Sequence, residues 1–278
     1  MAITNFIPTV WSESLLQALN QKYVGVANCN REFEGDIREK GSKVRICGVG
    51  NVTIGTYAKN TDISNPETLS DNYKELEIDQ ARYFNFQIDD VDRAQSLPRL
   101  MEGALSNAAN ALAGAADQYV YSVCAQAGQS IANASVTADN IIGTLIDART
   151  TLLKQNVTDP SDIVIEVSPD IAGLILKAKM ELATDNAATL EHGCIGNIGG
   201  CRIYVSSGIT SSLSGSVRTH DCIARTRRAV AYAEQLSEIE AYRPERRFAD
   251  AVKGLHLYGA KIVYPAEIVV LSLGVSTT

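Results

Sequence analysis

The residues that most resemble a chemical site lie in the glycine-rich segment GCIGNIGG, at residues 193–200. A dinucleotide-binding turn needs glycines in the order GxGxxG between a strand and a helix, because its backbone must approach a pyrophosphate. Here the glycines recur at every third position, and the segment precedes an expected strand, CRIYV, rather than a helix. The pattern therefore favours an ordinary turn over a nucleotide site.

The remaining reactive side chains also lack a recognised arrangement. His192, His220 and His256 show no HExxH spacing, and Cys194 beside His192 would need distant partners to hold a metal. No GxSxG elbow or GxxxxGK[ST] loop occurs in the sequence. The 6 cysteines are scattered without a CxxC pair, which indicates buried free thiols. The sequence offers no catalytic, cofactor or metal residue.

Length and composition limit the class of protein to which the chain can belong. A chain of 278 residues with 45% hydrophobic residues is long enough to bury a globular core. No apolar run reaches the roughly 18 residues of a membrane helix, and the N-terminus lacks the basic flank of a signal peptide. We therefore expect a soluble protein of the cytoplasm that does not associate with membranes.

The net charge of -7 argues against a protein held to DNA mainly by counterion release, which needs a basic surface. The basic residues cluster at two places, Arg225, Arg227 and Arg228 and then Arg243, Arg246 and Arg247. Acidic residues lie among or after both clusters, so we interpret them as solvated or ion-paired surfaces.

The first 88 residues predict a helix followed by a long hairpin. A helical apolar stripe that includes Trp11 and Leu15 predicts an amphipathic helix ending near Tyr23. KVRIC, VTIGTYA and a returning strand over residues 75–88 then predict an extended hairpin with a polar tip. Lys43 and Arg45 on one limb oppose Glu75 and Glu77 on the other, which predicts cross-strand ion pairs of about 0.2 to 1 kcal/mol each.

The rest of the chain predicts a long helix, an α/β segment and a set of strands. Apolar residues at helical spacing continue from residue 89 to about 127, and some 35 helical residues would extend about 50 Å. A helix over 139–153, the strand IVIEV and a helix starting at Ser168-Pro169-Asp170 follow. After a glycine-rich turn and CRIYV comes a Ser/Gly loop at 206–216, and the last third predicts mainly strands.

This order of elements resembles the major capsid proteins of tailed bacteriophages, which have the Hong Kong 97-type fold. GDIREKGSKVRI is similar to the family's entry into its extended loop, and NVTDPSDIVIEVSPDIAGLIL to the centre of its axial domain. IGNIGGCRIYVSSGI resembles the following turn and strand, and VKGLHLYGAKIVYPAEIVVL the last strands, which return to the peripheral domain. The resemblance implies an α+β fold with an N-terminal arm, an extended β-hairpin loop, a peripheral domain with a long spine helix, and an axial α/β domain.

The resemblance also implies a division of the chain. The expected parts are an N-terminal arm at 1–35, an extended loop at 36–84, a peripheral domain with the spine helix at 85–138, an axial domain at 139–233, and closing strands at 234–278 that return to the peripheral domain.

The implied function is self-assembly into hexamers and pentamers that form an icosahedral shell around phage double-stranded DNA, without catalysis or a cofactor. Expected partners are further copies of the chain, a separate scaffolding protein, a portal protein and DNA bound without sequence specificity. The expected location is the virion capsid, assembled in the cytoplasm of the host bacterium. The candidate subunit-interface residues are Trp11, Leu15, Lys43, Arg45, Tyr57, Lys59, Glu75, Glu77, Arg243, Arg246 and Arg247.

Two alternatives stay open. An encapsulin-like bacterial nanocompartment shares the fold and would enclose an enzyme in place of DNA. More remotely, the chain is an α+β enzyme with an unrecognised site.

Some capsid proteins of this fold also link a loop lysine to an asparagine of a neighbour, and Lys59 is a plausible donor. The sequence has no asparagine after Asn197, in the region expected to supply the acceptor, so we predict a shell without these bonds.

Overall fold

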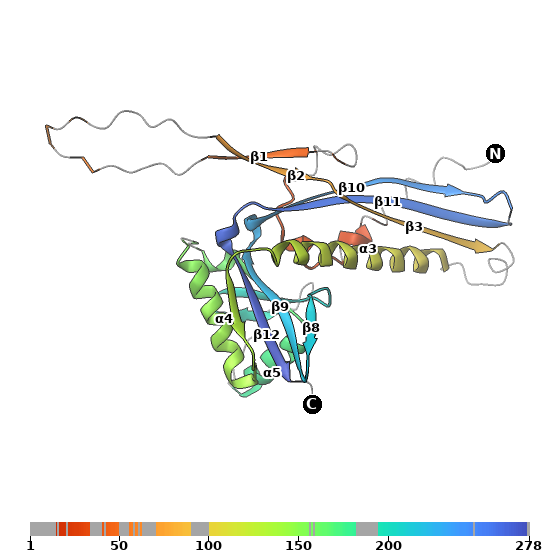
Figure 1. Cartoon of the computed structure of the whole chain (residues 1–278). Coiled ribbons are helices and arrows are strands. Elements are labelled where there is room, and N and C mark those ends of the chain that lie inside the picture. The colour runs from red at the N-terminus through yellow and green to blue at the C-terminus, as the bar shows by residue number, and fades with distance from the viewer. Residues whose placement is uncertain are drawn as a thin grey trace.

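The computed structural model describes residues 15, 17–20, 22–33, 41, 43–49, 56–57, 59–60, 62, 71–89, 100–155, 157, 159–181, 194–246 and 248–276. Its long helix, α3 (Leu100–Cys124), lies along a three-stranded antiparallel sheet (Figure 1). The strand order is β10 (Val230–Tyr242), β11 (Ala249–Ile262) and β3 (Gln80–Asp89). We call this helix and sheet the α3 layer.

Apolar alternation explains how the α3 layer holds together. Val252, Tyr258 and Ala260 recur at even positions of β11 and share one buried cluster with Leu112 and Val120 of α3. The 25 residues of α3 extend about 37 Å. The expected helix ran from residue 89 to about 127; the structure ends it at Cys124, and residues 90–99 lie outside the described part.

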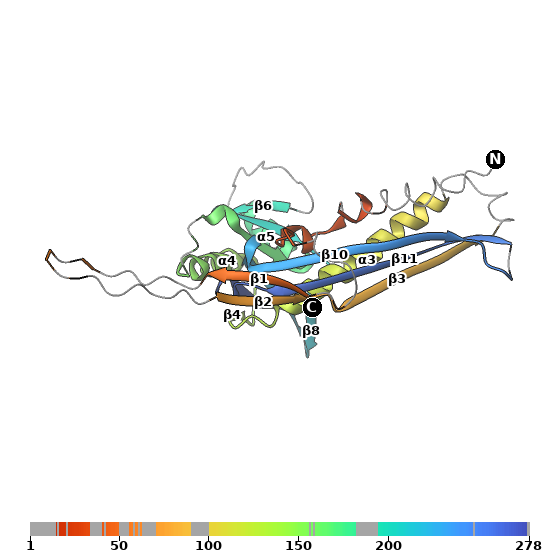
Figure 2. The ribbon, with the colours of Figure 1, turned by 90° about the horizontal axis from the view of Figure 1, so that it is seen from above.

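A two-stranded ribbon, β1 (Lys43–Val49) and β2 (Asp71–Glu77), packs on the other face of the sheet. Among the ribbon side chains that the structure describes, Val44, Ile46 and Leu76, which we call the base of the ribbon, share a buried cluster with Ala231 and Leu257. In Figure 2 the ribbon points toward one end of the molecule while the β10–β11 hairpin points toward the other. The subunit is therefore elongated.

The returning strand predicted over 75–88 is divided at Ile78 and Asp79. Residues before the break pair with β1, and residues after it pair with β11. Gly259 of β11 explains the close crossing at this point, because a Cβ there would lie 2.2 Å from the carbonyl oxygen of Glu77. The strand thus changes partners where only a glycine fits beneath it.

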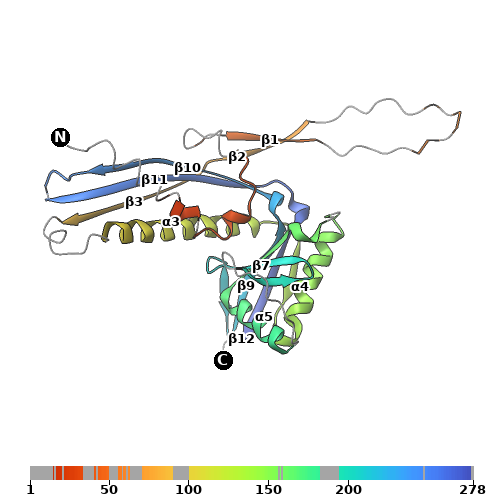
Figure 3. The ribbon, with the colours of Figure 1, turned by 180° about the vertical axis from the view of Figure 1, so that it is seen from behind.

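The second half of the subunit is a seven-stranded sheet with two helices, shown from behind in Figure 3. Its strands, in spatial order, are β4 (Ser130–Asn133), β12 (Ile268–Ser276), β9 (Val217–Thr226), β5 (Ile163–Val167), β7 (Cys201–Val205) and β6 (Cys194–Ile198), with β8 (Ser211–Ser214) paired to β9. Helices α4 (Ala138–Leu153) and α5 (Pro169–Glu181) pack on each other and contribute to one buried cluster with this sheet. Four short 3-10 helices complete the described elements: η1 (Val26–Asn28), η3 (Pro160–Asp162), η4 (Arg227–Ala229) and η5 (Pro265–Glu267).

Several expectations for this half are confirmed. The α4 helix, the buried strand IVIEV and the strand CRIYV form as predicted. Ser168 caps the start of α5, since its hydroxyl accepts a hydrogen bond from the backbone N–H of Ile171 at 3.4 Å. Cys29, Cys124, Cys201 and Cys222 are buried free thiols; the side chains of Cys47 and Cys194 lie outside the described part.

Other expectations are wrong. The glycine-rich turn is shorter than predicted, because residues 194–198 form β6 and only Gly199 and Gly200, both with positive φ, make the turn. The loop at 206–216 contains β8, and AVAYAE and LSEIEAY form one bulged strand, β10. The closing strands do not all return to the long helix. Residues 268–276 form β12, which pairs with β9 and β4 in the seven-stranded sheet.

Candidate assembly surfaces

The predicted charge pairs form on the β1–β2 ribbon. The register places Lys43 opposite Glu77 and Arg45 opposite Glu75. The Lys43 Nζ lies 3.3 Å from a Glu75 carboxylate oxygen and 4.0 Å from one of Glu77, and the Arg45 Nε lies 3.7 Å from Glu75. Arg45 also lies 5.1 Å from the centre of the Tyr73 ring, a cation–π contact. These side chains are largely exposed, so the pairs specify ribbon geometry more than stability.

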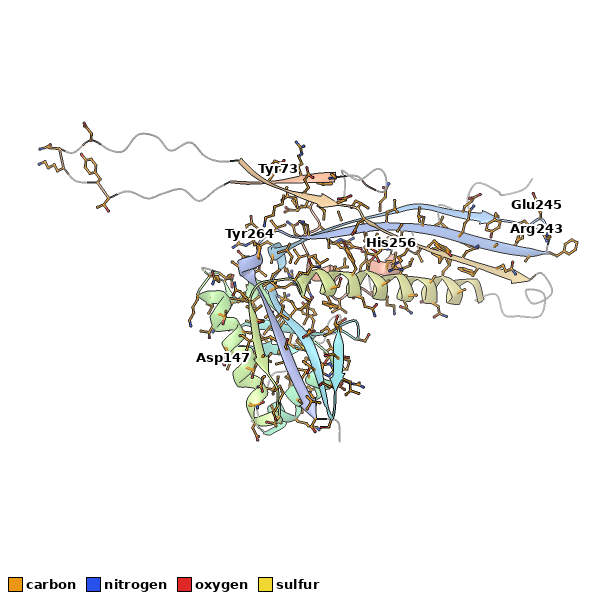
Figure 4. The ribbon with its side chains drawn as sticks, in the orientation of Figure 1. Tyr73, Asp147, Arg243, Glu245, His256 and Tyr264 are labelled. Atoms are coloured by element: carbon orange, nitrogen blue, oxygen red, sulfur yellow. The ribbon has the colours of Figure 1, made fainter. Side chains whose placement is uncertain are left out.

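Four other candidate interface residues lie away from the charge pairs of the ribbon. Tyr57 is 71% exposed, Lys59 is exposed, and the described pieces between residues 56 and 62 lie at the extreme left of Figure 1. Arg243 and Arg246 are exposed after the end of β10, and Figure 4 shows Arg243 and Glu245 at the right-hand end of the molecule, away from Tyr73. Trp11 and Arg247 lie outside the described residues. Among the candidate residues that the structure describes, it brings the four charged ribbon residues into contact with one another.

Leu15 does not suit the interface role proposed for it. Its side chain is 1% exposed and belongs to the buried cluster of α3, together with Leu19 and Tyr23. The described part of the predicted stripe thus packs on its own subunit, and residues 17–20 are helical.

An apolar surface remains uncovered on the three-stranded sheet, beyond the base of the ribbon. Tyr83 is 79% exposed and Leu255 is 38% exposed, and both line a shallow hollow of about 300 Å³ with Phe84 and Gly254. At its polar border, Lys253 pairs with Glu240 at 2.7 Å. Aromatic and aliphatic residues beside paired charges are typical of protein–protein contacts.

Sequence reasoning missed a buried ion pair between β5 and β9. The carboxylate of Glu166 accepts hydrogen bonds from the Nε and a terminal nitrogen of Arg225, both at 3.0 Å, and neither side chain is exposed. Arg225 also donates to the carbonyl oxygen of Gly25 at 2.7 Å and to the sulfur of Cys29 at 3.2 Å. Asn28 donates to Glu166 at 3.1 Å. The expectation of a solvated or ion-paired surface is therefore correct in the pairing of Arg225 but wrong in its location, which is buried. The signal was an acid inside the apolar strand IVIEV, which requires a buried partner.

Two more buried carboxylates bind the same N-terminal segment. Asp117 of α3 accepts hydrogen bonds from the backbone N–H groups of Val24 at 3.0 Å and Val26 at 2.9 Å. Burial raises the pKa of Asp117 to about 6, against the opposing effect of these hydrogen bonds. Lys22 and Gln118 border the polar hollow of about 260 Å³ that Asp117 lines.

Glu234 of β10 is the third carboxylate. It accepts hydrogen bonds from the hydroxyls of Tyr23 at 2.5 Å and Tyr232 at 3.1 Å, and it pairs with Arg31 at 2.6 Å. The Nε2 of His256 lies 2.9 Å from the same carboxylate. Burial opposes its charge, yet the hydrogen bonds from His256 and Tyr23 hold the pKa of Glu234 below its usual value.

Neither a metal site nor a membrane span is found in the described part of the chain. No group of three or more His, Cys, Asp or Glu there is arranged to hold a metal ion. No helix of that part is long and apolar enough to cross a membrane. The features that the structure does present are exposed ends and faces suited to protein contacts.

Comparison with known proteins shows the family of this chain. Residues 73–271 match the family described as phage capsid protein, which is well over half of the chain. The chain belongs to this family. No curated protein matches the capsid protein in sequence.

Among solved structures, one from Mycobacterium phage Che8 is 29% identical, with a TM-score of 0.72 over 97% of this chain and 98% of the other. The capsid structure of cyanophage P-SCSP1u is 18% identical, with a TM-score of 0.66 over 89% and 86%. A virus-like particle from Pyrococcus furiosus shares the fold at 12% identity and a TM-score of 0.57 over 96% and 99%. The capsid protein thus has the Hong Kong 97-type α+β fold expected from its sequence.

These findings make the capsid protein a structural component of the phage shell. Its location is the virion capsid, and its partners in an oligomeric shell include further copies of itself.

Proposed function

We propose that this capsid protein assembles into hexamers and pentamers of an icosahedral shell around phage double-stranded DNA, and that it catalyses no reaction. Assembly takes place in the host cytoplasm with a separate scaffolding protein and a portal protein, and DNA is enclosed without sequence-specific contacts. The observation that carries the proposal is the β1–β2 ribbon, whose base packs on its own subunit while the described residues 56–57, 59–60 and 62 are exposed.

Physical reasoning connects the ribbon to assembly. Val44, Ile46 and Leu76 at the base of the ribbon have apolar partners in the subunit, whereas the described residues between 56 and 62 are exposed. A segment that buries little surface in its own subunit gains little from being retained there. The uncovered face with Tyr83 and Leu255 offers apolar surface of the kind that a neighbouring copy covers. The five regions at 1–35, 36–84, 85–138, 139–233 and 234–278 remain our proposed division, with residues 268–276 reassigned to the axial sheet.

The ribbon charges test the proposal. Replacing Lys43 and Arg45 by Glu places acids at all four paired positions and should reduce shell yield, seen by electron microscopy and sedimentation. Replacing Glu75 and Glu77 by Lys in the same chain restores opposite signs and should recover assembly in part. An unaltered yield in the first variant, or no recovery in the second, would mean that these charges act independently of assembly.

The particle contents distinguish the phage shell from a nanocompartment. Shells purified from infected or induced cells should contain DNA that resists nuclease until the shell is opened. A shell that instead retains one cargo enzyme and no protected DNA would overturn the proposal in favour of the compartment. A chain that stays monomeric with and without a scaffold would overturn both.

A further inference from the structure

Residues 23–31, which we call the strap, lie where the α3 layer meets the seven-stranded sheet. Three buried carboxylates from three different elements bind it: Asp117 of α3, Glu166 of β5 and Glu234 of β10. Two of these elements belong to the α3 layer and one to the other sheet. The strap therefore bridges the two halves of the subunit with hydrogen bonds to each.

We propose that the strap is a lock that fixes the α3 layer at one angle to the seven-stranded sheet, and that its release frees this joint. Each hydrogen bond of the strap forms only within a narrow range of donor–acceptor distance and angle. Arg225 donates to the carbonyl oxygen of Gly25, and Asn28 donates to both Glu166 and the carbonyl oxygen of Val24. A rotation between the halves would break these bonds and leave buried polar groups unpaired, which is costly.

The halves also share contacts of a different kind. Ile209, Ile223 and Ile268 belong to the buried cluster of α3, so apolar surface is also shared between the halves. Apolar contact is non-directional and permits small rotations without a comparable loss. The strap is therefore the part of the joint that specifies the angle, while the apolar cluster holds the halves together.

Two variants weaken the strap at different points. Asn28→Ala removes the donor to Glu166 and leaves the Arg225 pair in place, and Arg31→Gln removes the cation from Glu234. The matched control is Asn133→Ala, which removes a similar bond, 3.1 Å to Thr144, inside one half only. All three are made in the full chain.

The angle is measured with spin labels on cysteines introduced at Asn107 of α3 and Asp147 of α4, both exposed helix positions. Figure 4 shows Asp147 on α4, in the half that contains the seven-stranded sheet. Cys47 and Cys194 are replaced by serine in every chain. Labelled chains are diluted with unlabelled ones, so that only distances within one subunit are read, whether or not the protein assembles. Amide hydrogen exchange by mass spectrometry reports the strap itself.

We expect amides of the strap to exchange about tenfold faster or more in Asn28→Ala and Arg31→Gln, as the loss of one buried charged hydrogen bond implies. The distance distribution between the labels should broaden in both variants and stay as in the unmodified chain for Asn133→Ala. An unaltered distribution despite a faster-exchanging strap would overturn the lock. So would unaltered strap exchange in both variants, or equal broadening in the control.

Discussion

The buried pair of Arg225 and Glu166 permits a sharp prediction, because the same chain offers an exposed counterpart. Arg228 makes a similar two-nitrogen contact with Glu267, at 2.9 and 2.7 Å, but its side chain is 62% exposed. Arg225 and Glu166 are 0% exposed. The two pairs have the same chemistry and differ in the solvation of the arginine, since the side chain of Glu267 is 9% exposed.

Replacing Arg225 by Met leaves the charge of Glu166 buried, with only Asn28 still donating to it among the bonds described. Removal of one partner from a buried pair costs about 3–5 kcal/mol of the free energy of unfolding. Replacing Arg228 by Met should cost about 0–1 kcal/mol, since solvent screens that pair and Thr226 still donates to Glu267. The double variant with Met at positions 166 and 225 should recover part of the loss, because no buried charge then lacks a partner.

The assay is urea unfolding of the unassembled chain, followed by circular dichroism, with the free energy extrapolated to water. The midpoint for the Arg225 variant should fall well below that of the Arg228 variant at an unchanged slope. Equal midpoints for the two variants would refute the reasoning, since burial would then have no influence on the pair. A double variant less stable than the Arg225 variant alone would refute the assignment of the loss to an unpaired carboxylate.

Three further predictions concern pH, packing and covalent bonds. The pKa of Asp117 is raised to about 6 from 3.8, so the folded chain binds its proton more tightly; the resulting stability is present below about pH 4 and is lost as pH rises through about 6, up to roughly 3 kcal/mol. Urea unfolding at several pH values should show this dependence in the natural chain and in Asp147→Asn, and a much smaller one in Asp117→Asn. Gly259→Ala should destabilise the chain by about 1–3 kcal/mol in thermal melts because its Cβ meets a backbone oxygen of β2, whereas Gly143→Ala on α4 has free space and should stabilise it by roughly 0.5–1 kcal/mol. Mature shells boiled in detergent and reductant should give one band near 29.9 kDa, and a ladder would contradict the absence of an acceptor after Asn197.

Sequence patterns predicted the elements whose environment is local. The strand IVIEV and helix α4 each lie within one layer, so their apolar spacing was sufficient. The break after Glu77 could not be predicted in this way, because it depends on Gly259, which is distant in sequence and lies beneath the crossing. The sheet that β12 joins was also hidden, since an apolar strand does not specify its partner.

The functional residues also differ in how well the sequence predicted them. The ribbon pairs were predictable because alternation along two antiparallel strands places opposite charges side by side. Arg225 was misread because Arg227 and Arg228, its neighbours in sequence, are exposed, and the three arginines look alike as a group. The acid at position 166 was the better guide, since a charge in a fully buried strand implies a buried partner even when the partner is unknown.

The distribution of charges suits a protein that must be rigid as a subunit and reversible as an assembly. Inside the subunit, Glu166, Asp117 and Glu234 are buried and hydrogen-bonded, so breaking their contacts is costly and the halves keep one arrangement. On the ribbon, Lys43 and Arg45 pair with acids of the same subunit; these pairs are exposed and each contributes little, and we propose that the same charges face a neighbouring copy in the shell. A closed shell repeats every contact many times, so strong contacts between subunits would retain copies that had joined at a wrong angle. Weak, screened contacts allow such copies to dissociate, and their number supplies the stability of the finished shell.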